Sequence, residues 1–208
     1  MRRFLVRAGL ALFVLMLVVV GGAAAYVWHL GNDAMTRATK SGWFERAGPN
    51  ELATPFEQTM QTAFFDEIWD KRSLPCSLIS GVWREGTGSS SRAETVWTIS
   101  MTLANDINWE EFVHSYSLES QLRRWSLACH LQGRFSDTQI MRIHLQRSRF
   151  GGEAGADEVA LALFGKPAGR LDFEESVRLA AIYHTPDMRG KPDEWNRRAE
   201  HVRELINR

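Results

Sequence analysis

Several residue types and patterns are scarce in this 208-residue chain, and each scarcity excludes a class of protein. Two cysteines are too few for a disulfide-rich scaffold or for a zinc site built from cysteine. Lysine and arginine number 25, against 25 aspartate and glutamate, so the chain lacks the basic excess of a general nucleic-acid binder. No stretch alternates polar and apolar residues over the length of a strand, and no Asn-Gly hairpin turn occurs. The sequence therefore predicts a nearly all-α protein without a nucleic-acid partner.

The charge is distributed unevenly, and this marks an N-terminal membrane segment. Residues 1–28 contain three arginines and no acid, whereas the remainder carries 22 basic and 25 acidic side chains. Between Arg7 and His29 lie 21 uncharged residues, enough for an apolar helix to cross the hydrocarbon core. Arginines before this run, with none directly after it, predict a cytoplasmic N-terminus and an exported domain. Tyr26 and Trp28 fall where an aromatic belt at the outer interface is expected.

A cleaved signal peptide is the alternative interpretation of this segment, with the alanines at 23–25 as its cleavage site. The apolar region of a signal peptide spans about 7–15 residues, and the longer run here favours an uncleaved anchor. Both interpretations export residues 29–208 to an oxidising compartment, where Cys76 and Cys129 can pair. Two unpaired, buried thiols are an equal alternative, because the sequence does not give the distance between the two side chains.

The exported part is expected to contain a linker and one domain. Residues 29–53 are polar with scattered glycines and are predicted to form the linker, and residues 54–208 form the domain. A helix is predicted to follow Thr54, with Pro55 at the first helical position and Glu57 completing a capping box. The same capping pattern recurs at two later sites: Ser136 with Gln139, and Asp172 with Glu175.

Apolar residues repeat at helical spacing through most of the domain. The expected stripes are Phe56, Met60, Phe64 and Ile68; Leu78, Val82 and Trp83; Ile99, Leu103 and Ile107; Leu118, Leu122, Trp125, Ala128 and Cys129; and Trp195, Ala199, Val202 and Ile206. Residues 84–94 are rich in glycine and serine and are expected to form a loop. A short helix over residues 156–164 is expected to end at Gly165.

Four motifs in the last third of the chain resemble those of a known family. In order they are FSDTQIMRIHLQRSRFG, ALALFGK, LDFEESVRLAAIYHTP and RRAEHVRELI. This succession resembles the peptidoglycan glycosyltransferase domain, glycosyltransferase family 51, of class A penicillin-binding proteins and monofunctional transglycosylases. The likeness covers residues 54–208 and is specific in the C-terminal part, where Gly165, Lys166 and Glu175 match the family pattern. It implies a lysozyme-like, all-α transglycosylase domain beside one N-terminal transmembrane helix.

The resemblance also implies a chemistry. Members of the family polymerise lipid II at the outer face of the inner membrane. A glutamate takes the proton from the acceptor sugar's 4-hydroxyl, which then displaces undecaprenyl pyrophosphate. The family's E-D-x-x-F motif is absent here, where the sequence reads FFDEIWDKRS and the glutamate position falls on Ile68. Glu67 is the candidate catalytic base; the alternative is an exposed helical acid, because a shift of one residue turns a helical side chain by ~100°.

Other catalytic positions of the family are also altered. The acid of the R-K-x-x-E motif falls on Arg124, and an arginine favours phosphate but cannot accept a proton. In the motif that the family writes STITQQLAKN, Asn105 replaces the lysine and Asp106 the asparagine. The candidate substrate-binding residues are Thr98, Ser100, Arg123, Arg124, Arg147 and Arg149. For the arginines, a solvated surface is the alternative interpretation.

These features predict a single-pass protein of the bacterial inner membrane, with its domain in the periplasm and a role in cell-wall assembly. Because scaffold motifs persist where catalytic motifs have changed, polymerising activity is expected to be weak or absent, as in a pseudoenzyme. The expected partners are lipid II or a glycan strand, the membrane, and a cell-wall synthase or other envelope protein. The alternatives are an active transglycosylase with Glu67 as base and a non-enzymatic, membrane-tethered assembly factor. His130 and His144 lack metal-ligand spacing, although the resemblance allows a divalent metal.

Overall fold

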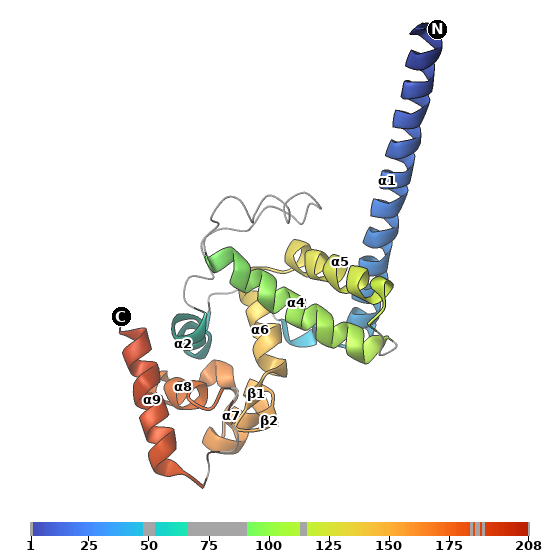
Figure 1. Cartoon of the computed structure of the whole chain (residues 1–208). Coiled ribbons are helices and arrows are strands. Elements are labelled where there is room, and N and C mark those ends of the chain that lie inside the picture. Colours follow the sequence, from blue (N-terminus) through green and yellow to red (C-terminus); the bar gives the residue numbers. More distant parts are fainter. Residues whose placement is uncertain are drawn as a thin grey trace.

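The computed structural model of the chain describes residues 2–47, 53–65, 91–112, 116–183, 185, 188 and 190–207. Its elements are α1 (Arg2–Lys40), η1 (Glu45–Ala47), α2 (Pro55–Phe64), α4 (Ser91–Glu111), α5 (Leu118–Arg134), α6 (Asp137–Arg147), β1 (Arg149–Phe150), β2 (Glu153–Ala154), α7 (Ala156–Phe164), η2 (Ala168–Arg170), α8 (Phe173–Ala180) and α9 (Pro192–Ile206). Strands β1 and β2 form one short antiparallel pair, and the other elements are helical (Figure 1). The expected mainly helical fold is therefore confirmed.

Helix α1 extends away from the other helices as one long rod (Figure 1). Every large apolar side chain from Leu12 to Val20 is at least 50% exposed. The segment Leu12–Lys40 reaches a mean hydropathy of 2.0, which makes it long and apolar enough to cross a membrane. An apolar surface of this kind is unfavourable in water and favourable in a hydrocarbon core. The structure thus contains a helix that fits the expected anchor.

Residues 29–53 were expected to form a linker, but the first part of this range is helical. Helix α1 continues without a break to Lys40, and its last turns pack on α5. The side chains of Leu30, Ala34 and Ala38 are buried there, although the residues around them are polar. At Gly31 an added Cβ would overlap the side chain of Ser126, so the glycine permits close approach of the two helices. The small residues that suggested a linker instead form the face of α1 that contacts α5.

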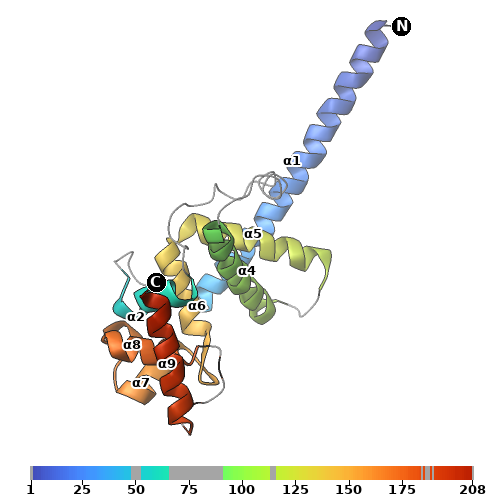
Figure 2. The ribbon, with the colours of Figure 1, turned by 60° about the vertical axis from the view of Figure 1, so that its left-hand side comes forward.

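The helices form two groups on either side of α6. Helix α1, α4 and α5 contact one another, and α2, α8 and α9 form a second set of contacts. Helix α6 contacts α4 and α5 on one side and α7 on the other, and Figures 1 and 2 show it between the two groups. One core runs through both groups, with Leu103, Leu127, Ile140, Phe150 and Leu179 fully buried. The two groups therefore form a single packed body.

A buried ion pair joins α2 to α6. The carboxylate of Glu57 accepts hydrogen bonds from Arg142, at 2.5 Å from Nε and 3.1 Å from Nη2. The same carboxylate accepts the backbone N–H of Thr54 at 2.8 Å, which is half of the capping box of α2. Arg142 also donates from Nη1 to the carbonyl oxygen of Ala47, 3.0 Å away, so the pair links η1 as well. The side chains of Glu57 and Arg142 are only 8% and 16% exposed.

The local signals for helix ends are confirmed. All three expected capping boxes are present, at the starts of α2, α6 and α8. Helix α7 ends at Gly165, whose φ of 71° is left-handed and favours glycine. One helix boundary and the burial of one side chain differ from expectation. Helix α4 begins at Ser91, inside the expected loop at 84–94, and Phe64 at the end of α2 is 41% exposed. Ile68 and the stripe Leu78, Val82 and Trp83 lie outside the described residues.

The apolar stripe expected to bury α5 is confirmed only in part: Ala128 is fully buried, whereas Leu118 and Trp125 are exposed. Leu118 is 72% exposed and Trp125 is 36% exposed, whereas Leu127 and Leu131 are fully buried. Ser120 is on the buried side, where its hydroxyl accepts a hydrogen bond from α4. The expectation was wrong for Leu118, because Ser120 is buried in its place: a polar side chain with a partner is stable in the interior, and that partner comes from another helix. Of the two cysteines, Cys129 is disulfide-bonded, and Cys76 lies outside the described residues.

Candidate functional site

A polar seam runs between α4 and α5. Helix α4 places Asn105 and Asn108 on one face, since residues three apart are neighbours on a helix. Helix α5 places Ser120, Arg123 and Arg124 opposite them. The side-chain amide of Asn108 donates to the hydroxyl of Ser120 at 2.9 Å, and both residues are buried. The seam is therefore a specific contact that sets how the two helices lie against each other.

Arg123 is held within the seam by three groups. Its guanidinium forms an ion pair with Glu119 one turn earlier on α5. It also donates to the side-chain oxygen of Asn108 at 3.4 Å and lies over the ring of Phe112, 4.1 Å from the centroid. Because a carboxylate already neutralises its charge, Arg123 orders the end of α4 and is a weak candidate for binding an anionic substrate.

Arg124 keeps its positive charge without an acidic partner among the described residues. Its Nη1 donates to the side-chain oxygen of Asn105 at 2.8 Å, and its Nε is buried with no hydrogen-bond partner there. The resemblance places a lysine at 105 and a glutamate at 124, and the structure brings these two positions into contact. An amide and a guanidinium therefore meet at this contact, and together they carry one net positive charge.

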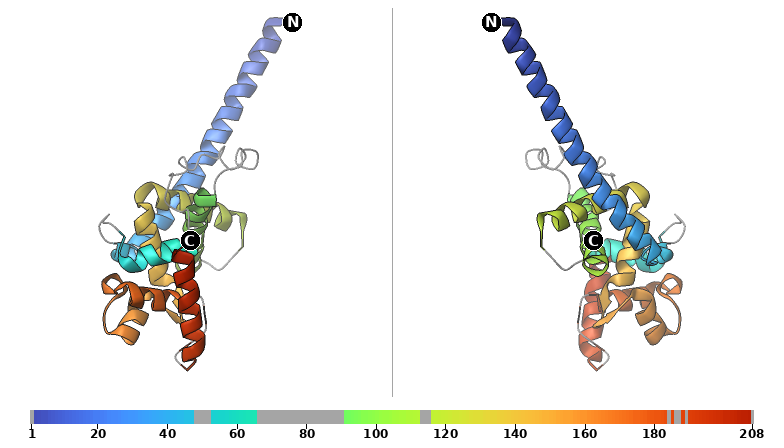
Figure 3. Two further views of the ribbon diagram at one scale, coloured as in Figure 1. Left: turned by 90° about the vertical axis from the view of Figure 1, so that its left-hand side faces the viewer. Right: turned by 90° about the vertical axis from the view of Figure 1, so that its right-hand side faces the viewer.

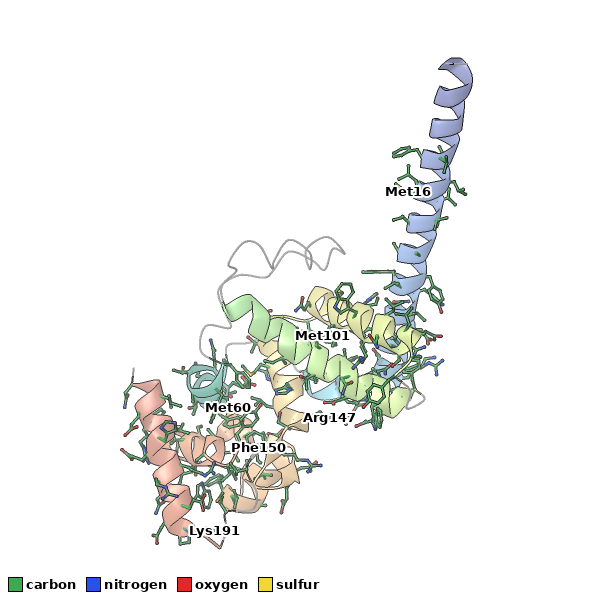
Figure 4. The ribbon with its side chains drawn as sticks, in the orientation of Figure 1. Met16, Met60, Met101, Arg147, Phe150 and Lys191 are labelled. Atoms are coloured by element: carbon green, nitrogen blue, oxygen red, sulfur yellow. The ribbon has the colours of Figure 1, made fainter. Side chains whose placement is uncertain are left out.

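Arg147 lies on the other side of α4, at the end of α6 (Figure 4). It is 3.4 Å from the carboxylate of Glu110 and lies over the ring of Trp43, 3.7 Å from the centroid. One turn before Glu110, burial and the nearby Glu110 charge raise the pKa of Asp106, with Arg147 opposing them. Arg147 therefore compensates two acids of α4, and the structure does not group it with Arg124.

The remaining expected site residues are not brought together. Arg149 is exposed on β1, next to the fully buried Phe150. Ser100 is fully buried on the core side of α4, and its hydroxyl has no hydrogen-bond partner among the described residues. Thr98 lies on the same helix, but its side chain is outside the described part. Glu67 also lies outside the described residues, so its role as a base stays a prediction.

Sequence reasoning missed a polar cluster beside the end of α2. His144 Nε2 and the hydroxyl of Tyr183 are 3.1 Å apart, and burial raises the pKa of Tyr183. Phe65 packs edge-on against both rings, with centroids at 6.1 Å from His144 and 5.9 Å from Tyr183. The cluster thus holds the chain one residue before the segment that carries the candidate acid. Within the described ranges, no group of histidine, cysteine or acid side chains is placed to hold a metal.

The C-terminal motif residues have a structural explanation. Lys166 Nζ is 2.6 Å from the carboxylate of Glu175, which also accepts the backbone N–H of Asp172 at 2.9 Å. The lysine after Gly165 is therefore tied to the capping box that begins α8. Through these contacts, Lys166 and Glu175 link the end of α7 to the start of α8.

The comparisons with known proteins agree with this reading. The sequence model of the family described as Transglycosylase matches residues 76–207. Penicillin-binding protein 1C of Escherichia coli (strain K12) is 30% identical over 94 residues. That alignment covers 45% of this chain and 12% of the relative, so the chain spans a small part of the relative's length. Transglycosylase domains are lysozyme-like and helical, as this domain is. The chain therefore belongs to the transglycosylase family.

Proposed function

We propose that this protein is a membrane-anchored cell-wall protein that binds a lipid-linked glycan through its diphosphate and polymerises it weakly or not at all. Arg124 is the observation that carries the proposal. A guanidinium stands where the resemblance places an acid, and its partner Asn105 is neutral. Because arginine stays protonated, it cannot take the proton from a sugar hydroxyl, whereas it binds phosphate oxygens well.

The proposed ligand is lipid II or a glycan strand that is still attached to its lipid diphosphate. Membership of the transglycosylase family supports this ligand class. The apolar length of α1 supports an anchor in the inner membrane, and the three N-terminal arginines support a periplasmic domain. With this orientation, the domain lies on the side of the membrane where the family's substrate is displayed.

Binding of lipid II to the full chain in nanodiscs tests the proposal. A unit charge 4 Å from a phosphate contributes about 1 kcal/mol in a water-like dielectric, so Arg124→Glu changes the energy by about 2 kcal/mol. The expected result is a Kd raised about 30-fold. Asn105→Lys added to Arg124→Glu restores one of the two lost charges and should recover about half of that free energy. Arg134→Glu, about 15 Å further along α5, is the matched control and should leave the Kd unchanged.

Each alternative function has its own outcome. Equal effects of Arg124→Glu and Arg134→Glu would contradict a diphosphate site at the seam. Glycan polymer made by the wild-type chain and abolished in Glu67→Gln would establish an active transglycosylase. No lipid II binding in native mass spectrometry, together with a defined co-purifying envelope protein, would establish a non-enzymatic assembly factor.

A further inference from the structure

An exposed pair of aromatic side chains lies at one end of the polar seam between α4 and α5. Trp109 of α4 and Tyr116, two residues before the first residue of α5, are 43% and 80% exposed in the complete chain. Their ring centroids are 6.1 Å apart, and the ring planes are inclined by 49°. Tryptophan and tyrosine combine a large apolar face with a polar group, so they are common where a protein contacts a ligand.

This aromatic pair continues the row of contacts that includes Arg124. Along the seam, residue numbers rise on α4 as they fall on α5, so the two helices are antiparallel. Trp109 follows Asn105, the partner of Arg124, by four residues, which places both on one face of α4 about 6 Å apart along its axis. Asn105 and Trp109 are exposed, whereas Asn108 is buried. The exposed edge of the seam therefore carries a cation and, one helical turn away, two aromatic rings.

Contacts with α1 show which end of the seam is farther from the proposed membrane anchor. Trp28, in the expected aromatic belt, stacks on His130 of α5 with ring centroids 3.9 Å apart. Arg37 lies over the ring of Phe112, 4.7 Å from the centroid. Trp28 and Arg37 are nine positions apart on α1, which corresponds to about 14 Å of helix. Because Phe112 follows Trp109 by three residues, the aromatic pair lies at the end of the seam farther from the belt.

Arg124 lies nearer to the belt than the aromatic pair does. It is two positions from Ser126, which packs against Gly31, and Gly31 is only three positions after Trp28 on α1. Figures 1 and 2 show α4 running away from the N-terminal part of α1, and Figure 3 shows α1 leaving the domain at the end opposite to α9. Starting from the membrane side, the seam thus presents first the cation and then the aromatic rings.

We propose that Trp109 and Tyr116 bind the first sugar ring of the lipid-linked glycan whose diphosphate Arg124 binds. The inference rests on the proposed function. In such a molecule the diphosphate joins the lipid to a pyranose, so the sugar lies farther from the bilayer than the diphosphate, in the order that the seam presents. One helical turn, about 5.4 Å, is close to the distance between a sugar ring and the diphosphate bonded to it.

The chemistry of the two side chains suits a pyranose. One face of the sugar ring presents C–H groups, and these stack on an aromatic ring because the ring face carries partial negative charge. The hydroxyl of Tyr116 can donate a hydrogen bond to a sugar oxygen or accept one from a sugar hydroxyl. The aromatic pair therefore distinguishes a glycosylated lipid diphosphate from a bare one, which Arg124 alone does not.

Binding of lipid diphosphates with and without a sugar tests this inference. Lipid II and undecaprenyl diphosphate are each titrated onto the full chain in nanodiscs. Trp109→Ala should raise the Kd for lipid II about fivefold to tenfold and leave the Kd for undecaprenyl diphosphate unchanged. Trp109→Phe keeps an aromatic face and should recover most of the affinity. Tyr116→Ala removes a side chain that the core does not contact closely, since it is 80% exposed, and should act in the same direction as Trp109→Ala. Phe173→Ala, at an aromatic residue that is 48% exposed on α8, is the control and should change neither Kd.

The outcomes separate this inference from the proposed function. If Arg124→Glu weakens both lipids while Trp109→Ala and Tyr116→Ala bind lipid II as the wild-type chain does, the sugar contact is wrong and the diphosphate site stands. If Trp109→Ala and Tyr116→Ala weaken both lipids equally, the aromatic pair does not recognise the sugar, and the inference is overturned. If Arg124→Glu changes the Kd of neither lipid, the proposed function fails, and this inference fails with it.

Discussion

Among the ion pairs that the structure describes, the buried pair of Glu57 and Arg142 is expected to contribute most to stability. Glu57→Gln removes the carboxylate that pairs with the guanidinium of Arg142, in a site where the Arg142 side chain is 16% exposed. The capping box survives this change, because glutamine serves the same role at Gln139. Breaking a buried pair destabilises by about 3–5 kcal/mol, and the remaining amide oxygen should hold the loss to about 3 kcal/mol.

Thermal unfolding of the full chain in nanodiscs measures the effect. For a domain of this size, about 3 kcal/mol lowers Tm by roughly 6–12 °C. The double variant Glu57→Gln with Arg142→Met removes the buried guanidinium together with the carboxylate and should recover much of the loss. The matched control is Glu200→Gln, which breaks an exposed pair with Arg203 and should cost at most about 1 kcal/mol. A Tm for Glu57→Gln no lower than that of Glu200→Gln would refute the reasoning.

Two further substitutions test charge and close packing in the first helix group. The pKa of Asp106 is raised by burial and by Glu110, so its ionisation costs stability as the pH rises through that pKa. Asp106→Asn should raise the urea midpoint of unfolding near pH 7 and leave it unchanged near pH 3. If the variant and the wild-type chain have the same midpoint near pH 7, the pKa of Asp106 is not raised in the folded state. Gly31→Leu would overlap Ser126 and should cost about 1–3 kcal/mol, lowering Tm by roughly 2–12 °C. Gly22→Leu, which meets open space, is its control, and equal shifts would show that the close contact of α1 with α5 does not matter.

The candidate site could be predicted only in part. The resemblance predicts that Arg124 reverses the charge of this position, which stays a prediction. The sequence alone could not show that Asn105 is its partner, because the two residues come from different helices. Arg123 and Arg147 have the same residue type as Arg124, yet each has a carboxylate partner, Glu119 and Glu110 respectively. A count of arginines therefore overestimates the cations that a substrate can use. The pairing of each one depends on which helices meet.

Short-range features were determined by the sequence itself. Thr54 with Glu57 and the glycine at 165 act through hydrogen bonds and backbone angles within one helical turn, so their effect needs no information from the rest of the chain. The 21 uncharged residues that follow Arg7 likewise suit a bilayer by length alone.

Only the tertiary structure decided which face of each helix is inside. Leu118 and Ser120 lie on the same helix, and hydrophobicity predicted the wrong one as buried, because Asn108 of α4 satisfies the serine hydroxyl. The small residues around Gly31 are compatible with a linker or with a tight helix contact, and the presence of α5 selects the contact. Whether a side chain is buried depends on the surface that packs against it, and the sequence of one helix does not show which other helix supplies that surface.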